Sequence, residues 1–189
     1  MLVEGESDRA AVLALAATRG ADLDGVDVVA MGGITNVARY VAELVPQRLR
    51  LAGLYDAGEE RFVRGALERA GLQPGPGARG LAELGFHCCD RDLEDELIRA
   101  LGVERVLAVI EGQGDLGALR GLQQQPAQRD RRTEDQLHRF FGAGSGRKVR
   151  YGRLLVAALA ADEVPAPLAA VLADALARSD GAEVRRSGT

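Results

Sequence analysis

The stretch LVEGESD (residues 2–8) places an apolar pair directly before a cluster of acidic residues. A short apolar run followed by a glycine, which permits a tight turn, is typical of a strand that leads into a helix. Residues 6–19 have the apolar periodicity of that helix. Asp8 falls in its first turn, four residues after Glu4, so both carboxylates can face the same side. We expect Glu4 and Asp8 to lie together at the end of the first strand.

The same order of a strand followed by a helix recurs three more times before residue 103. The apolar runs are VDVVAM (26–31), LRLAGLYD (49–56) and GFHCCD (85–90), and the amphipathic stretches that follow them are residues 35–45, 59–70 and 93–101. Repeated strand–helix units form a parallel sheet with helices on its faces and right-handed crossovers. The sequence therefore predicts an α/β fold with a parallel sheet of about four strands. The segment GLQPGPGARG (71–80) is rich in glycine and proline and is expected to be a loop.

The pattern changes after Gly102, where no further β-rich run appears. We expect one α/β domain over residues 1–102, a C-terminal helical region over residues 103–180 and a disordered tail over residues 181–189. Acidic residues outnumber basic ones up to residue 117, and basic residues outnumber acidic ones after it. The molecule thus joins an acidic part to a basic part.

Composition excludes several classes of protein. The net charge of -4 argues against a protein that coats nucleic acid by bulk electrostatics. No apolar run approaches the roughly 18 residues of a membrane span, and the N-terminus does not have the pattern of a secretory signal, so we expect a cytoplasmic protein without a membrane partner. The adjacent Cys88 and Cys89 suit neither a metal knuckle nor an ordinary disulfide.

Acidic residues follow three of the four predicted strands. Besides Glu4 these are Asp56, which ends LRLAGLYD, and the acids of CCDRDLEDEL, residues 88–97. The carboxyl ends of parallel strands meet at one edge of the sheet. Each like-charged pair about 4 Å apart costs about 4 kcal/mol at an effective dielectric constant near 20. Divalent cations offset this cost, because Mg²⁺ and Mn²⁺ prefer hard oxygen ligands.

The segments LVEGESD and LYDAGEE together resemble the Toprim domain, whose pattern is Glu-Gly after the first strand and Asp-x-Asp after the third. More narrowly, MGGITNVARYV, LAGLYDAGEE, DLEDELIRALG and SGRKVRYGRLLV resemble, in this order, the C-terminal Toprim region of the overcoming-lysogenization-defect (OLD) family nucleases. The resemblance covers the chain up to about residue 178. It implies a Toprim-like, Rossmann-like sheet followed by helices.

The resemblance also implies a set of metal ligands. Carried over by matching position, Glu4 and Asp8 form the first motif, Asp56 is the first acid of Asp-x-Asp, and Asp92 and Glu94 lie in the third acidic cluster. Gly58 stands where the second Asp is expected, followed by Glu59. Either Glu59 reaches in as a substitute ligand or one metal site is weakened. The implied cofactors are two Mg²⁺ or Mn²⁺ ions, with Ca²⁺ as a candidate inert substitute.

In this family the carboxylates hold two metal ions that cut DNA. The resemblance therefore implies a DNA endonuclease or nickase that works by a two-metal mechanism, with Glu4 also a candidate general base. The alternatives are a non-catalytic Toprim subunit that docks on a separately encoded ATPase, or another Toprim activity such as RNA processing or primer synthesis. No G-x-x-x-x-G-K-[S/T] motif is present, so an ATPase would come from another chain. Either a truncated start or a separate subunit is expected, and a homodimer is a candidate assembly.

Lys148 is the only lysine among 24 basic residues. Its compact ammonium differs from the planar guanidinium group, so a site that retains it is expected to need a point charge. We predict that Lys148, which also matches the family's basic motif, contacts the scissile phosphate and is catalytic; an exposed lysine on a solvated helix is the alternative. With it, Arg147, Arg150 and Arg153 are predicted DNA contacts. Core or surface packing is expected for the two histidines, His87 and His138.

Overall fold

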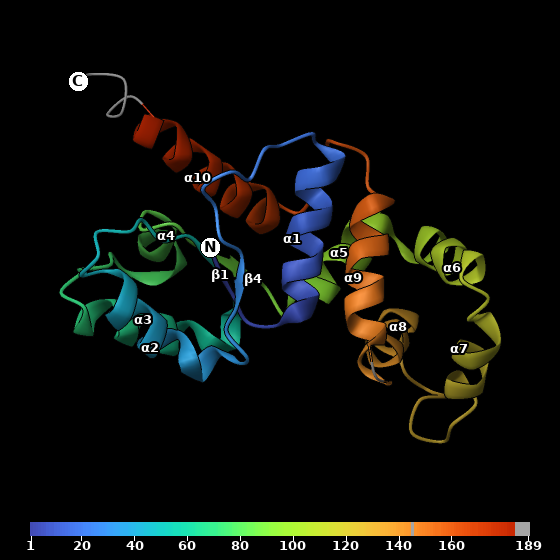
Figure 1. Cartoon of the computed structure of the whole chain (residues 1–189). Coiled ribbons are helices and arrows are strands. Elements are labelled where there is room, and N and C mark those ends of the chain that lie inside the picture. The colour runs from blue at the N-terminus through green and yellow to red at the C-terminus, as the bar shows by residue number, and fades with distance from the viewer. Residues whose placement is uncertain (145, 184–189) are drawn as a thin grey trace.

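The computed structural model describes residues 1–144 and 146–183, and the side chains up to residue 177. The first part alternates strands and helices in the predicted order (Figure 1). Its elements are β1 (Leu2–Val3), α1 (Glu6–Thr18), β2 (Val29–Ala30), the 3-10 helix η1 (Ile34–Asn36), α2 (Val37–Leu44), β3 (Gly53–Asp56), the 3-10 helix η2 (Ala57–Glu59), α3 (Glu60–Arg69), α4 (Gly77–Ala82), β4 (Phe86–Cys89) and α5 (Leu93–Leu101).

The second part is helical throughout, as predicted. Its helices are α6 (Val103–Gly112), α7 (Leu116–Gln123), α8 (Thr133–Gly142), α9 (Arg147–Ala157) and α10 (Ala166–Glu183). Of the tail predicted for residues 181–189, the first three residues belong to α10, and residues 184–189 lie outside the described part of the chain. None of the helices in the described ranges combines the length and the apolar character that a membrane span needs.

The four strands form one parallel sheet in the order β2-β1-β3-β4. Successive side chains of a strand point to opposite faces, and the two residues of β1 show this directly. Leu2 packs with apolar residues of α2 and α3, whereas Val3 packs with α1 and the later helices. The predicted fold class is therefore confirmed, and all four strands end at the same edge of the sheet.

The helical region does not form a core of its own. Phe140, Phe141 and Tyr151 are fully buried in the same apolar cluster as Val3 and Leu15. Helix α9 packs along α1, and α10 returns to cover β3 and β4 (Figure 1). A Cβ atom placed on Gly152 would lie 3.1 Å from the backbone oxygen of Ser7, so the absence of a side chain permits the close contact between α9 and α1.

One local prediction was wrong. The glycine-rich and proline-rich stretch 71–80 is not a loop throughout, because α4 begins at Gly77, directly after Pro76. Gly80 lies against the backbone of Gly75 so closely that a Cβ on Gly80 would come within 2.0 Å of the Gly75 oxygen. The absence of a side chain lets the helix turn back on the segment before it. Tertiary packing thus overrides the weak helix propensity of glycine here.

Candidate metal centre

The first acidic group lies at the junction of β1 and α1. The backbone oxygen of Glu4 accepts hydrogen bonds from the N–H groups of Gly32 and Gly33, both at 3.0 Å, which ties the end of β1 to the segment after β2. Asp8 lies in the first turn of α1, and its Oδ2 accepts the N–H of Gly5 at 2.9 Å. The backbone of Glu4 and the side chain of Asp8 are thus each held by hydrogen bonds.

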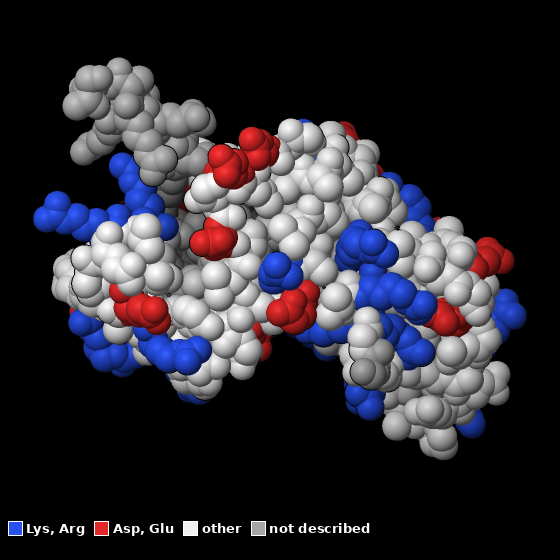
Figure 2. All heavy atoms as spheres, viewed as in Figure 1, with Lys and Arg blue, Asp and Glu red and all other residues white. Residues whose placement is uncertain are grey.

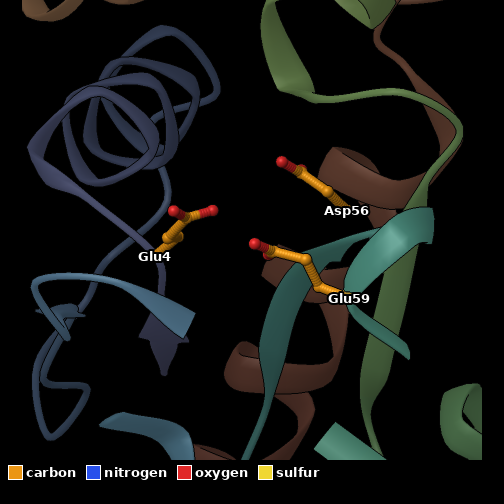
Figure 3. Close-up of side chains that lie close together, drawn as sticks. All are labelled: Glu4, Asp56 and Glu59. Carbon is orange, nitrogen blue, oxygen red and sulfur yellow. The ribbon is translucent and has the colours of Figure 1, made fainter. Parts of the chain in front are cut away.

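The second acidic group follows β3. Asp56 ends this strand and Glu59 ends η2. Carboxylate oxygens of Glu4, Asp56 and Glu59 all lie within 4.8 Å of one another, and Figure 3 shows the three side chains pointing toward one space. The Oε2 atom of Glu59 is buried and has no hydrogen-bond partner within the described residues. Of the two alternatives given for the missing second Asp, this arrangement agrees with the first, in which the Glu59 side chain lies beside Asp56.

The third acidic group begins α5, directly after β4. Asp92 is the N-cap of this helix, and its Oδ1 accepts the N–H of Asp95 at 2.8 Å. Two basic side chains of the helical region reach this group. The Nε2 atom of His138 on α8 lies 2.5 Å from Oδ2 of Asp92, and Nζ of Lys148 on α9 lies 3.1 Å from Oε2 of Glu94. The side chain of Glu94 is only 5% exposed.

Three of these carboxyl groups have raised pKa values because they are buried and lie near other acids. Burial, followed by the charges of Glu4 and Asp92, raises the pKa of Asp56 to about 8. Burial and Glu4 raise the pKa of Glu59 to about 7. Burial and the charge of Glu94 raise the pKa of Asp8 to about 6. Burial away from water and nearby like charges both disfavour the charged form of a carboxyl group.

The pKa of Asp92 is shifted in the opposite direction. Burial alone would raise its pKa, but the hydrogen bonds from His138 and from the N–H of Asp95 lower it below the ordinary value. The acids therefore divide into two sets. Asp92 and Glu94 have basic partners within the protein, whereas Glu4, Asp56 and Glu59 form no ion pair within the described ranges. Oxygen donors without a cation are the donor set that suits Mg²⁺ or Mn²⁺.

Solved structures of one family match this fold over nearly the whole chain. With the C-terminal region of the Xanthomonas campestris pv. campestris OLD protein, the TM-score is 0.71 at 26% sequence identity, covering 100% of this chain and 95% of that chain. The chain has the fold of the OLD C-terminal region. With the C-terminal region of the Burkholderia pseudomallei OLD protein, the TM-score is 0.70 at 22% identity, covering 92% and 94% of the two chains. No protein-family model and no curated protein matches the sequence.

The OLD-type fold confirms the resemblance inferred from the four sequence segments. Within it, Glu4, Asp56 and Glu59 are brought into one group of potential ligands. Asp8, Asp92 and Glu94 are not members of that group. The charges of Asp8 and Asp92 still act on it, since both raise the pKa of Asp56. Gly58, where the second Asp of the motif is expected, is exposed, and a Cβ placed there has no atom within 4 Å.

The arginines of the OLD-type helical region differ in their surroundings. Figure 2 shows basic side chains gathered on the face of the molecule over α9. Arg147 stacks over the ring of Phe140 at 4.2 Å and donates to the backbone oxygens of Phe140 and Ala143. Arg150 pairs with Asp115, which also accepts the hydroxyl of Tyr151. Arg153 is exposed without an ion pair to any described residue, so of these three it is the freest to meet a phosphate. Their contact with DNA stays a prediction.

Sequence reasoning missed the role of His138 in this site. A histidine on an amphipathic helix is ordinarily a packing residue, and nothing in the HRFF segment indicates a contact with a carboxylate 46 residues earlier. The contact depends on how α8 packs against α5, which no local pattern reveals. Asp92 itself was predicted as a metal ligand, and it is the carboxylate that His138 contacts.

Proposed function

We propose that this chain is a divalent-metal-dependent DNA endonuclease or nickase that hydrolyses phosphodiester bonds by a two-metal mechanism. The observation that carries the proposal is the group Glu4, Asp56 and Glu59, whose oxygens lie within 4.8 Å of one another without a basic partner in the described residues. Its location at the carboxyl edge of a parallel sheet is where α/β proteins bind their ligands. The similarity of the fold to OLD C-terminal regions agrees with a nuclease.

The residues have distinct roles in this proposal. Glu4, Asp56 and Glu59 would hold one ion, and Asp8, Asp92 and Glu94 would contribute to the second site. When bound, two such ions activate a water and stabilise the leaving oxygen. The pKa values of Asp56 and Glu59 are raised to about 8 and about 7, so binding of a cation near neutral pH is expected to release protons from this group.

Lys148 supplies a positive charge beside these acids, since its charge lowers the pKa values of Asp8 and Glu59. Burial lowers the pKa of its ammonium group, but the charge and hydrogen bond of Glu94 together with the charges of Asp8 and Asp92 raise the pKa above the ordinary value, so the group stays charged at neutral pH. Its side chain is 49% exposed, so it is held by Glu94 and still accessible to a substrate. A fixed ammonium group in this position can stabilise the charge that develops on a scissile phosphate. Arg153 would contact the backbone farther along.

Nicking of supercoiled plasmid DNA in Mn²⁺ tests the proposal. We expect wild-type protein to convert the plasmid to the open-circular form and Glu4→Gln to lose this activity. Glu6→Gln is the matched control, because Glu6 is an exposed acid two residues away that pairs with Arg9. Mn²⁺ and Ca²⁺ are both expected to raise the melting temperature of the wild type, with Ca²⁺ giving no cleavage. An inert wild type whose melting temperature does not respond to either ion would contradict the proposal.

A second candidate is a non-catalytic subunit that docks on a separately encoded ATPase. Gly58 favours it, since the chain lacks the second Asp of the motif at this position. The same assay separates the two, because a docking subunit would leave the plasmid intact in Mn²⁺. Labelled RNA and nucleotides offered under the same conditions test for RNA processing or primer synthesis, and a preference for RNA would overturn the proposed DNA substrate.

A further inference from the structure

Both carboxylate oxygens of Asp92 are held by donors from the protein. Oδ1 accepts the N–H of Asp95 at 2.8 Å, and Oδ2 lies 2.5 Å from Nε2 of His138. A carboxylate only accepts hydrogen bonds, so Nε2 carries the proton of this contact. The two donors fix the rotation of the carboxylate about its Cβ–Cγ bond. Each oxygen retains a further lone pair for another partner.

Helix α8 does not need His138 in order to dock. Its neighbours in the same helix, Leu137, Phe140 and Phe141, are fully buried in the core, and Asp135 pairs with Arg91 at 3.0 Å. Burial of one large apolar side chain stabilises by about 1.5 to 3 kcal/mol, so these three residues outweigh one partly exposed contact. The His138 side chain is 24% exposed and lies beside this anchor. The helix therefore holds the histidine in place.

We propose that His138 is a positioning residue that orients the Asp92 carboxylate for metal binding. The inference rests on the proposed function, because Asp92 is one of the proposed ligands. A ligand whose other contacts are fixed loses less conformational freedom when a cation binds, so affinity depends on the residue behind the ligand. His138 and Lys148 together make the helical region part of the proposed metal site, since each contacts one acid at the start of α5.

The chain supplies a matched control in its other histidine. Nε2 of His87 on β4 lies 2.8 Å from Oδ2 of Asp174 on α10, so His87 also joins two elements through an aspartate. Its side chain is 14% exposed, compared with 24% for His138. Neither His87 nor Asp174 belongs to the acidic groups. Replacing His87 therefore measures the general cost of losing such a contact.

The experiment titrates the full chain with Mn²⁺ at fixed pH and measures binding by calorimetry. We expect His138→Leu to weaken Mn²⁺ binding by about 10- to 100-fold, the usual range for residues that hold a ligand in place. His138→Gln, whose side-chain amide can donate to Asp92, is expected to recover most of the affinity. His87→Leu is expected to bind Mn²⁺ as the wild type does. His138→Ala is measured in parallel, with thermal melting as the check of folding.

The outcomes are separable from those of the proposed function. Affinity of His138→Leu and His138→Ala within twofold of the wild type would overturn the role of His138. Tighter binding would also overturn it, because His138 would then compete with the cation for Oδ2. A wild type that binds Mn²⁺ but does not nick DNA would contradict the nuclease and leave the positioning role supported by its own measurement. A wild type that does not bind Mn²⁺ would overturn both.

Discussion

The ammonium group of Lys148 lies 3.1 Å from the carboxylate of Glu94, whose side chain is 5% exposed. This pair joins α9 of the helical region to the start of α5 at the sheet edge. Because Glu94 is buried, removing Lys148 would leave its charge without compensation. The pair therefore gives Lys148 a structural role in addition to its proposed contact with the phosphate. Measuring both nicking and Mn²⁺ binding distinguishes the two roles.

Lys148→Met is expected to lower the nicking rate by about 10²- to 10³-fold, the usual cost of losing one charge-stabilising group in the transition state. Mn²⁺ affinity is expected not to fall, because Glu94 loses its cation and remains available to the metal. The rate constant of nicking and calorimetric Mn²⁺ affinity are measured side by side, with Arg153→Met as a control for general loss of basic charge. Unchanged nicking by Lys148→Met would contradict the proposed contact between Lys148 and the scissile phosphate.

Without metal, we expect stability to fall as the pH rises from about 5 to about 8. The folded-state pKa of Asp56 is about 8, against an ordinary value of 3.8. Between these values the folded state holds a proton that the unfolded state has released, so stability decreases with pH. We expect the free energy of unfolding to fall by at least about 1 kcal/mol over this range. This figure is low because Asp56 is partly exposed and water screens its charge.

Urea unfolding at several pH values measures this loss. Asp56→Asn is expected to flatten the decline, leaving the smaller contributions of Glu59 and Asp8, whose pKa values of about 7 and about 6 act in the same direction. Addition of Mn²⁺ is expected to reverse the decline in the wild type. Stability that rises steadily across this range in metal-free buffer would show that the carboxylates are not crowded as described.

Gly58→Asp is expected to tighten Mn²⁺ binding by about tenfold, equivalent to about 1.4 kcal/mol, and to increase nicking. Gly58 does not have a positive φ angle, and a Cβ there meets no atom within 4 Å, so the backbone and the Cβ position accept the substitution. Calorimetry measures the affinity, and Ala57→Asp is the control for an added acid at a neighbouring exposed position. Equal effects of the two substitutions would indicate that general negative charge, and not a restored ligand, is responsible.

Gly152→Val is expected to destabilise the protein by about 1 to 3 kcal/mol, the usual cost of overpacking a close contact. A Cβ on Gly152 would lie 3.1 Å from the backbone oxygen of Ser7, and Ser7 directly precedes Asp8. The contact lies between α1 and α9, so both Asp8 and Lys148 would shift. Urea unfolding measures the loss, with Gly121→Val on an open surface as the control for β-branching. No difference between the two variants would contradict the described packing of α9.

The sheet and the acidic strand ends could be predicted because each depends on local pattern. Glu4 and Asp56 each follow an apolar run, and the topology of parallel strands then brings such positions to one edge. The surroundings of the basic residues could not be predicted in this way. Arg150 and Asp115 are 35 residues apart, and His138 and Asp92 are 46 apart, so their pairing depends on helix packing. Helix α4 was missed because it depends on the contact of Gly80 with Gly75 in the segment before the helix, which no local pattern reveals.

The shared core of the two parts has a practical consequence for dissecting the protein. A fragment that ends at residue 102 would lose Phe140, Phe141 and Tyr151, which belong to the same apolar cluster as Val3. Apolar surface uncovered in this way promotes aggregation. The sheet and the helices are therefore expected to fold and melt as one cooperative unit, and shortened versions are a poor choice for mapping activity.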